Sequence, residues 1–212
     1  MLGHFRRTLL TARRHDEPFR HWLLDDVLPP FLADALAALP FAAPMFGDTA
    51  GRRETQNASR RFVTSAERDE YPACAAFAEL MQDVSTTELI ETVCGRSLKG
   101  AYLRIEHCLD TNGFWLEPHT DIAAKLFTML IYLSQQSDAE FWGTDLLDGP
   151  QRLVGRASGR FNAGLIFLPA SNTWHGFARR PIAGLRRSLI VNYVTSDWRS
   201  RHELAFPDRP VG

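Results

Sequence analysis

Two polar side chains near the middle of the chain, His119 and Asp121, stand two residues apart directly before an apolar run at 125–134. In extended backbone, side chains at positions i and i+2 point to the same side of a strand. An imidazole and a carboxylate placed in this way can bind one metal ion together. The pair alone is weak evidence, because His15 and Glu17 occur at the same spacing in the basic N-terminal stretch.

A second histidine would complete a set of two imidazoles and one carboxylate, a donor set typical of non-haem Fe(II) sites. His175 is the candidate, because it lies in LPASNTWHGF, just after an apolar run that predicts a strand. His107 ends another predicted strand and is interpreted as a packing residue. The remaining histidines lie in the N-terminal segment or in the polar tail, at His4, His15, His21 and His202.

The last predicted strand, LRRSLIVNYV at 185–194, presents a group suited to a carboxylate. Its alternation places Arg186, Ser188 and Asn192 on one face. An arginine beside a serine hydroxyl forms a charge-assisted fork for a carboxylate anion. Only a short turn separates this strand from His175, so we expect the fork and the metal ligands to lie within the length of one small molecule.

The elements that must position these residues change in character near residue 100. From there on, short runs rich in β-branched and aromatic residues follow one another without an intervening helical pattern. Serial strands of this kind indicate an antiparallel sandwich or barrel. The runs predicted as strands lie at 100–107, 125–134, 151–155, 160–169 and 185–194.

The first hundred residues predict mainly helices. Ser85 is expected to cap the last of them together with Glu88, and Gly95 is expected to end it. The basic N-terminal end is interpreted as solvated and partly frayed. The predicted elements are an extended segment at 20–28 and helices at 31–40, 72–84 and 85–95.

A long arginine-rich loop is predicted at 41–61. Connections of this length inside a compact domain usually mark a lid, a binding loop or disorder. The loop is either a solvated surface segment or a lid over 44–61 that meets a polar or anionic substrate, and the sequence leaves both open. Its polar residues include Arg52, Arg53, Asn57, Arg60 and Arg61.

Length and composition bound the class of protein. The 212 residues suit a single domain, and a net charge of −1 argues against nucleic acid or a membrane surface as the partner. Cys74, Cys94 and Cys108 form an odd, widely spaced set without a CxxC pair, which favours a reducing compartment and predicts a cytoplasmic location. No apolar stretch is long enough to span a membrane. The oligomeric state is left open.

The order of the motifs resembles one enzyme family. HTD, a strand ending IYLS, GTDLL, WHG and Gly-x-Arg-x-Ser follow one another over about 100–195. This series is similar to the iron(II)- and 2-oxoglutarate-dependent dioxygenases, and within them to the prolyl-4-hydroxylase-like branch. The resemblance implies a mainly β fold with α: a double-stranded β-helix (jelly roll, cupin-like) with N-terminal helices packed on one sheet. Residues 1–98 would be the helical support with the lid loop, and 99–196 the jelly-roll core.

The resemblance also implies a site and a reaction. His119, Asp121 and His175 would hold Fe(II), with 2-oxoglutarate and O2 at the remaining positions. Arg186, helped by Ser188, would bind the far carboxylate of 2-oxoglutarate, which is oxidised to succinate. Tyr132 and Tyr102 are similar in position to residues that touch the co-substrate, although both could instead be core tyrosines with satisfied hydroxyls.

The oxidised substrate is left open by the sequence. We expect a small polar molecule, such as an amino acid or a sugar derivative, that is hydroxylated, desaturated or epimerised. The alternatives are a peptidyl hydroxylase of the prolyl-4-hydroxylase type and a non-catalytic metal-binding cupin module. Arg186 stands where the prolyl hydroxylases proper carry lysine, which leaves the choice of substrate in doubt. Candidate substrate contacts are Arg104, Trp115, Glu117, Asn57 and Asn192.

Overall fold

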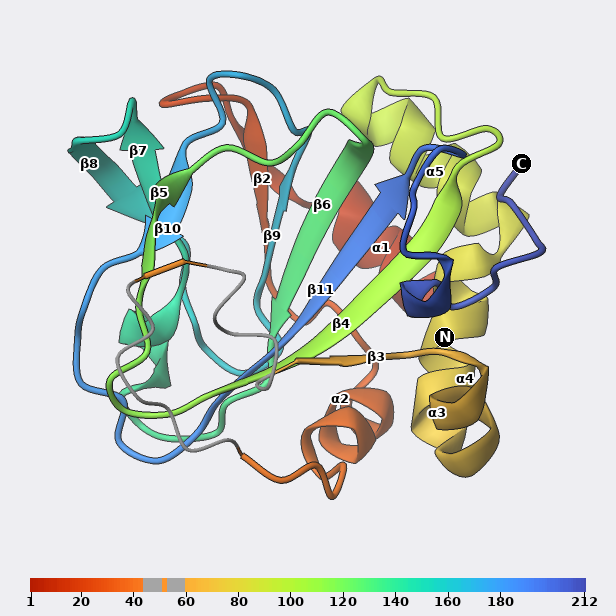
Figure 1. Cartoon of the computed structure of the whole chain (residues 1–212), viewed down its shortest axis with the longest axis horizontal. Coiled ribbons are helices and arrows are strands. Elements are labelled where there is room, and N and C mark those ends of the chain that lie inside the picture. The colour runs from red at the N-terminus through yellow and green to blue at the C-terminus, as the bar shows by residue number, and fades with distance from the viewer. Residues whose placement is uncertain (44–50, 53–59) are drawn as a thin grey trace.

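Two antiparallel sheets form the body of the protein in this computed structural model, which describes residues 1–43, 51–52 and 60–212. Within the described residues, every strand pairing is antiparallel. The mainly β fold predicted from the sequence is therefore confirmed. The larger sheet has the order β1 (Arg13–His15), β2 (His21–Leu24), β9 (Gly164–Phe167), β6 (Lys125–Tyr132), β11 (Arg186–Val194), β4 (Tyr102–Asp110) and β3 (Arg60–Phe62) (Figure 1).

The smaller sheet supplies the other wall of the jelly roll. Its strands are short, and its order interleaves segments that are far apart in the sequence, as Figure 1 shows. The order is β5 (Leu116–His119), β10 (His175–Phe177), β7 (Asp145–Asp148) and β8 (Arg152–Arg156).

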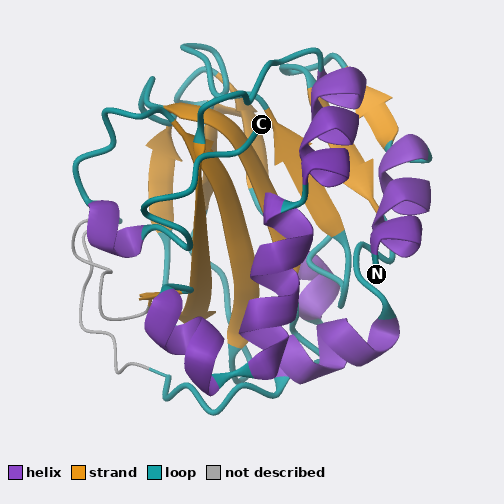
Figure 2. Ribbon diagram, turned by 90° about the vertical axis from the view of Figure 1, so that its right-hand side faces the viewer, coloured by secondary structure: helices purple, strands orange, loops and turns teal. Residues whose placement is uncertain are grey.

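The helices gather mainly on one face of the larger sheet (Figure 2). On β6, Phe127, Met129 and Ile131 point into this helix-side core, while Thr128 and Leu130 line a cavity between the two sheets. The period of two along one strand thus separates packing from the candidate site. None of the helices in the described chain is long and apolar enough to cross a membrane. The helices are α1 (Leu2–Leu10), α2 (Pro30–Ala37), α3 (Ser65–Glu70), α4 (Pro72–Gln82) and α5 (Val84–Cys94).

The N-terminal end corrects one prediction. It is not frayed but forms α1, with Phe5 and Leu9 buried in the main core. These residues are four apart and so lie on one face of the helix, which anchors the basic segment despite its arginines.

The start of α5 corrects another. Asp83, not Ser85, is the N-cap, and its carboxylate accepts hydrogen bonds from the backbone N–H groups of Ser85 and Thr86. An aspartate satisfies two of the free N–H groups at a helix start, so the serine is drawn into the first turn. Gly95 ends the helix in the left-handed conformation with φ of +73°, as predicted.

The predicted loop at 41–61 is only partly described, and the lid question lies outside the described residues. Its last two residues are not loop: Arg60 and Arg61 belong to β3, which pairs with β4 at the edge of the larger sheet. Arg60 is buried against the candidate site, whereas the guanidinium of Arg61 lies 4.8 Å from the centre of the Phe41 ring.

His107 is a fully buried packing residue, as predicted, and gives the protein an acid-sensitive point. Its Nε2 lies 3.3 Å from the Leu36 carbonyl, and its ring packs edge-on against Phe41. Burial lowers the pKa of His107 from 6.5 to about 4. The unfolded chain therefore takes up this proton first as the pH falls, and protonation destabilises the fold.

We expect a His107→Gln variant to be less sensitive to acid than the wild type. Glutamine keeps an N–H donor for Leu36 but has no charge to acquire. Relative to this variant, the wild type should lose about 3 kcal/mol of unfolding free energy between pH 6.5 and pH 4. Urea unfolding of both proteins across this range measures the difference, and parallel curves would contradict the assignment.

Candidate metal and co-substrate site

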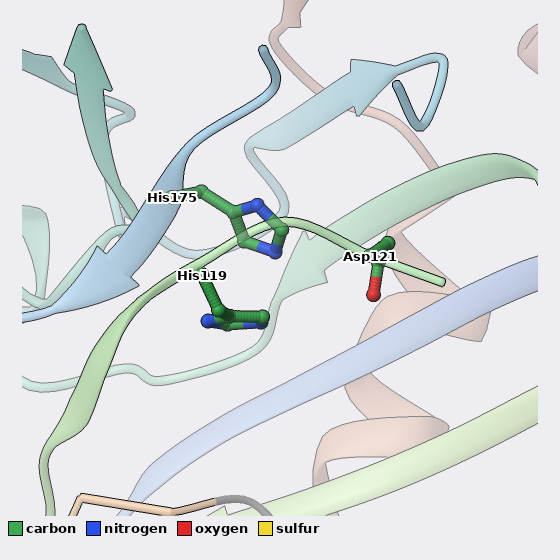
Figure 3. A group of neighbouring side chains, drawn as sticks. All are labelled: His119, Asp121 and His175. Atoms are coloured by element: carbon green, nitrogen blue, oxygen red, sulfur yellow. The ribbon is translucent and has the colours of Figure 1, made fainter. Parts of the chain in front are cut away.

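Three potential metal ligands converge between the sheets (Figure 3). His119 ends β5 and His175 begins β10, and the two residues are direct partners across the antiparallel pair. Their ring centres are 4.3 Å apart. Asp121 follows two residues after His119, and one ligand atom from each of the three side chains lies within 4.8 Å of the others. The structure therefore brings together the residues that the sequence predicted.

Backbone carbonyls fix which nitrogen each imidazole offers. Nδ1 of His119 lies 2.9 Å from the Glu117 carbonyl, and Nδ1 of His175 lies 2.9 Å from the Thr173 carbonyl. A carbonyl only accepts, so each Nδ1 carries the proton and each Nε2 keeps its lone pair for a metal. Burial lowers the pKa of His175 to about 4, so this ring is neutral at ordinary pH. Two imidazoles and a carboxylate fit a divalent iron ion.

The Asp121 carboxylate is held at both oxygens. Lys125 Nζ lies 2.6 Å from Oδ1, and the Thr128 hydroxyl donates to Oδ2 at 3.0 Å. Asn192 Nδ2 in turn donates to the Thr128 hydroxyl at 2.9 Å. Asn192, predicted as a substrate contact, is therefore linked to Asp121 through the Thr128 hydroxyl. Lys125 and Thr128 are site residues that were not singled out from the sequence.

Arg186 and Ser188 lie in the same cavity as the three candidate ligands, which confirms their predicted shared face. Arg186 Nε donates to the Trp142 carbonyl at 2.6 Å, and its Nη1 pairs with the buried Asp110 carboxylate. Among the described residues, Nη2 of Arg186 makes no hydrogen bond, and the buried Ser188 hydroxyl has no partner. These two donors suit an additional carboxylate, so the residues present fit 2-oxoglutarate.

Asp110 is a site residue that sequence reasoning missed. It stands opposite Arg186 in the β4–β11 register, and one of its oxygens is buried without a partner. Burial raises the pKa of Asp110, while Arg186 and Arg60 act in the opposite direction. The signal was present in the sequence, because alternation along β4 continues the polar face of Arg104 and Glu106 to Asp110.

The two predicted tyrosines lie in different places. Tyr132 is buried, and its hydroxyl donates to the Thr144 hydroxyl at 2.9 Å. Thr144 lines the cavity that holds the candidate metal ligands and Arg186, called the inner cavity below. Tyr132 therefore packs behind the wall of this cavity. Tyr102 does not line this cavity and packs against Arg201, whose guanidinium carbon is 4.0 Å from the ring centre. The structure places Tyr132, but not Tyr102, next to a residue that lines the cavity, and a co-substrate contact stays a prediction for both.

An outer cavity of about 410 Å³ adjoins the metal ligands. Arg104 and Glu117 line it, and their role as substrate contacts stays a prediction. Arg104 lies between the rings of Phe62 and Trp198, with its guanidinium carbon 4.7 and 5.0 Å from their centres.

Two other predicted substrate contacts are not placed at this cavity. Trp115 lines neither the inner nor the outer cavity. Its ring lies against Gly51, where a β-carbon would meet ring atoms at 2.3 Å. The guanidinium carbon of Arg179 lies 4.6 Å from the ring centre. Asn57 lies outside the described residues.

Comparison with solved structures finds the same architecture in three prolyl hydroxylases. One from Trichoplax adhaerens, solved with a peptide fragment of the hypoxia inducible factor oxygen degradation domain, has a TM-score of 0.60 and 13% identity, over 94% of this chain and 91% of that one. A prolyl-4-hydroxylase from Pseudomonas putida has a TM-score of 0.52 and 17% identity, over 92% and 93%. A viral collagen prolyl hydroxylase from Paramecium Bursaria Chlorella virus-1, in a 2OG complex, has a TM-score of 0.52 and 12% identity, over 82% and 96%.

No family model matches the sequence of this chain, and no curated protein matches it. The likenesses therefore concern the fold, and they cover most of this chain and of each solved structure. The chain has the jelly-roll-like fold of the prolyl hydroxylases.

Proposed function

We propose that the protein is an Fe(II)- and 2-oxoglutarate-dependent oxygenase. The observation that carries the proposal is one cavity lined by His119, Asp121 and His175 at one end and by Arg186 and Ser188 at the other. Bound Fe(II) and 2-oxoglutarate would together supply, with O2, the oxidising power to break a substrate C–H bond, while 2-oxoglutarate is converted to succinate and carbon dioxide. The likeness of fold to prolyl hydroxylases supports the same reading.

The protein residues divide the work of binding. His119, Asp121 and His175 would hold the metal, and Arg186 with Ser188 would orient the far carboxylate of the co-substrate. The apolar side chains that line the inner cavity keep bulk water away, which strengthens the charge interactions inside it. These apolar residues are Phe114, Leu116, Leu130, Phe177 and Ile190.

A metal-binding module without turnover is the main rival. Such a module needs the three metal ligands but has no use for a buried arginine with an open donor beside an unpartnered hydroxyl. Arg186 and Ser188 therefore favour an enzyme. Affinity for 2-oxoglutarate distinguishes the two.

For the substrate we propose a small polar molecule, such as an amino acid or sugar derivative. The outer cavity of about 410 Å³ lies in the range of small-ligand sites and supports this class. A peptidyl hydroxylase is the second candidate, because the Trichoplax adhaerens structure of the same fold is a peptide complex. Hydroxylation, desaturation and epimerisation all begin with the same loss of a hydrogen atom.

The experiment combines the protein with Fe(II) and 2-oxoglutarate under anaerobic conditions. We expect a weak visible charge-transfer band that needs both components, and succinate release once air is admitted. Succinate formation across amino acids, nucleotide sugars and prolyl peptides then identifies the substrate class. Absence of the band together with absence of 2-oxoglutarate binding would contradict the proposal.

We also propose a reducing, cytoplasmic setting. Cys74, Cys94 and Cys108 are buried free thiols. Burial raises the pKa of Cys74 to about 11 and that of Cys94 to about 12, so these two remain protonated and unreactive.

A further inference from the structure

A β-bulge at the start of β6 decides where Lys125 points. From Tyr132 back to Phe127, β6 and β11 pair residue by residue, but the next residue of β11, Val194, pairs with Lys125 and passes over Leu126. An extra residue in one strand reverses the alternation beyond it. Without the bulge, Lys125 would share the helix-side face of Phe127; with it, Lys125 lines both cavities and Leu126 packs on the main core.

The Lys125 ammonium is buried against Asp121, one of the candidate metal ligands. The Lys125 side chain is 4% exposed and that of Asp121 is 5% exposed, with 2.6 Å between Nζ and Oδ1. A buried cation is stable only when it is paired, and the charge of Asp121 stabilises that of Lys125. A metal bound by His119, Asp121 and His175 would be coordinated by the same Asp121 carboxylate that pairs with Lys125.

The ion pairs around the two cavities balance in charge within the described chain, and the exposed Glu117 carboxylate at the outer cavity is not part of them. Among the described residues, the buried ion pairs at this place join four cations to four carboxylates. A divalent metal alone would add two positive charges to this neutral group, and the 2-oxoglutarate dianion alone would add two negative ones. Uncompensated charge is costly in a buried site, so the pair should bind better together than either alone. The members are Arg60, Arg104, Lys125 and Arg186 with Glu106, Asp110, Asp121 and Glu203.

We infer that Lys125 is a charge-balancing residue of the metal site. Its ammonium opposes binding of a divalent metal in the absence of co-substrate, and it thereby couples metal loading to the arrival of the dianion. The inference rests on the proposed function, because it takes 2-oxoglutarate as the dianion. Lys125 acts through Asp121 and through the local charge, without contact to reacting atoms.

The test removes the charge and keeps the hydrogen bond. In Lys125→Gln the side-chain amide can still donate to Asp121, and Lys125→Met removes both. The dissociation constant of Mn(II), measured by electron paramagnetic resonance with and without 2-oxoglutarate, is the readout. We expect 2-oxoglutarate to tighten Mn(II) binding to the wild type, and both variants to bind Mn(II) alone at least about tenfold more tightly, with the coupling reduced by a similar factor.

The chain offers a matched control. It contains only two lysines, and the other, Lys99, is exposed on a turn far from the site in sequence. Lys99→Met should leave both Mn(II) constants unchanged, and Lys125→Arg should keep the wild-type coupling because the charge is retained. Circular dichroism confirms that each variant is folded.

Other outcomes separate the inference from the proposed function. Weaker or unchanged Mn(II) binding in Lys125→Gln would overturn the charge-balancing role, and a weakened constant would assign Lys125 to holding Asp121 in place. If the wild type binds neither Mn(II) nor 2-oxoglutarate, the proposed function itself fails. By reciprocity, the coupling measured through 2-oxoglutarate affinity must give the same factor, which checks each result.

Discussion

Replacement of His175 by alanine is expected to abolish Fe(II) binding while leaving the protein folded. The substitution removes one of the imidazoles from the only group of metal-ligating side chains found in the described chain. The two remaining candidate ligands, His119 and Asp121, do not complete a facial triad. Lys125 also pairs with the Asp121 carboxylate and therefore competes with the metal for it. Isothermal titration calorimetry with Fe(II) under anaerobic conditions measures the loss of metal affinity.

The control for this variant is His202→Ala, because His202 is an exposed histidine in the C-terminal tail. It should retain the wild-type Fe(II) affinity. Full metal affinity in His175→Ala would show that His175 is not a ligand, and would move the metal site elsewhere.

Loss of Arg186 should produce two separable effects. In Arg186→Met, the buried Asp110 carboxylate loses the cation with which it forms an ion pair, which should lower the unfolding free energy by roughly 3 kcal/mol, since Arg60 still lies nearby. The same variant should bind 2-oxoglutarate at least about 30-fold more weakly, because the charged partner of its carboxylate is gone. Urea unfolding and calorimetry measure the two effects.

A double variant separates binding from stability. Addition of Asp110→Asn to Arg186→Met removes the unpaired charge, so most of the lost stability should return. Affinity for 2-oxoglutarate should stay low, because the amide restores no cation. If the double variant regains 2-oxoglutarate binding, the weakness of the single variant came from damage to the fold, and Arg186 is not the carboxylate partner.

The convergence of His119 with Asp121 and the cavity face of Arg186 could be predicted from the sequence because both depend on local regularity. His119 and Asp121 needed only the alternation of extended backbone, and Arg186 needed only the alternation of β11. His175 was found by chemical elimination among few histidines. The structure places His119 and His175 opposite each other across one antiparallel pair, which makes their convergence a property of the β5–β10 register.

Lys125 could not have been predicted by the same reasoning. Alternation counted back from Thr128 places Lys125 on the helix-side face, and only the bulge at Leu126 reverses this. A bulge depends on how two strands that are far apart in the sequence pair with each other. No local pattern in KLFTMLIYLS indicates it. The residue that we propose balances the charge of the metal site is thus hidden by an irregularity in strand pairing.

Arg60 was missed for a related reason. It lies in a stretch of polar residues that reads as a loop, yet its side chain is 5% exposed and its Nη1 lies 2.7 Å from the Glu106 carboxylate. A three-residue edge strand is too short to show a period, so its existence follows from pairing with β4. The polar face of β4, with Glu106 at its centre, is what draws Arg60 inward.

The pairing of β5 with β10 has a consequence for the rigidity of the whole small sheet. β10 has only three residues, and its register with β5 shifts between His175 and Phe177. A metal bound by His119, Asp121 and His175 would act as a cross-link between two chain segments whose backbone contact is short. Loading the metal would therefore tighten the wall of the adjoining cavity, so that the ion would also act as a structural cross-link of the small sheet.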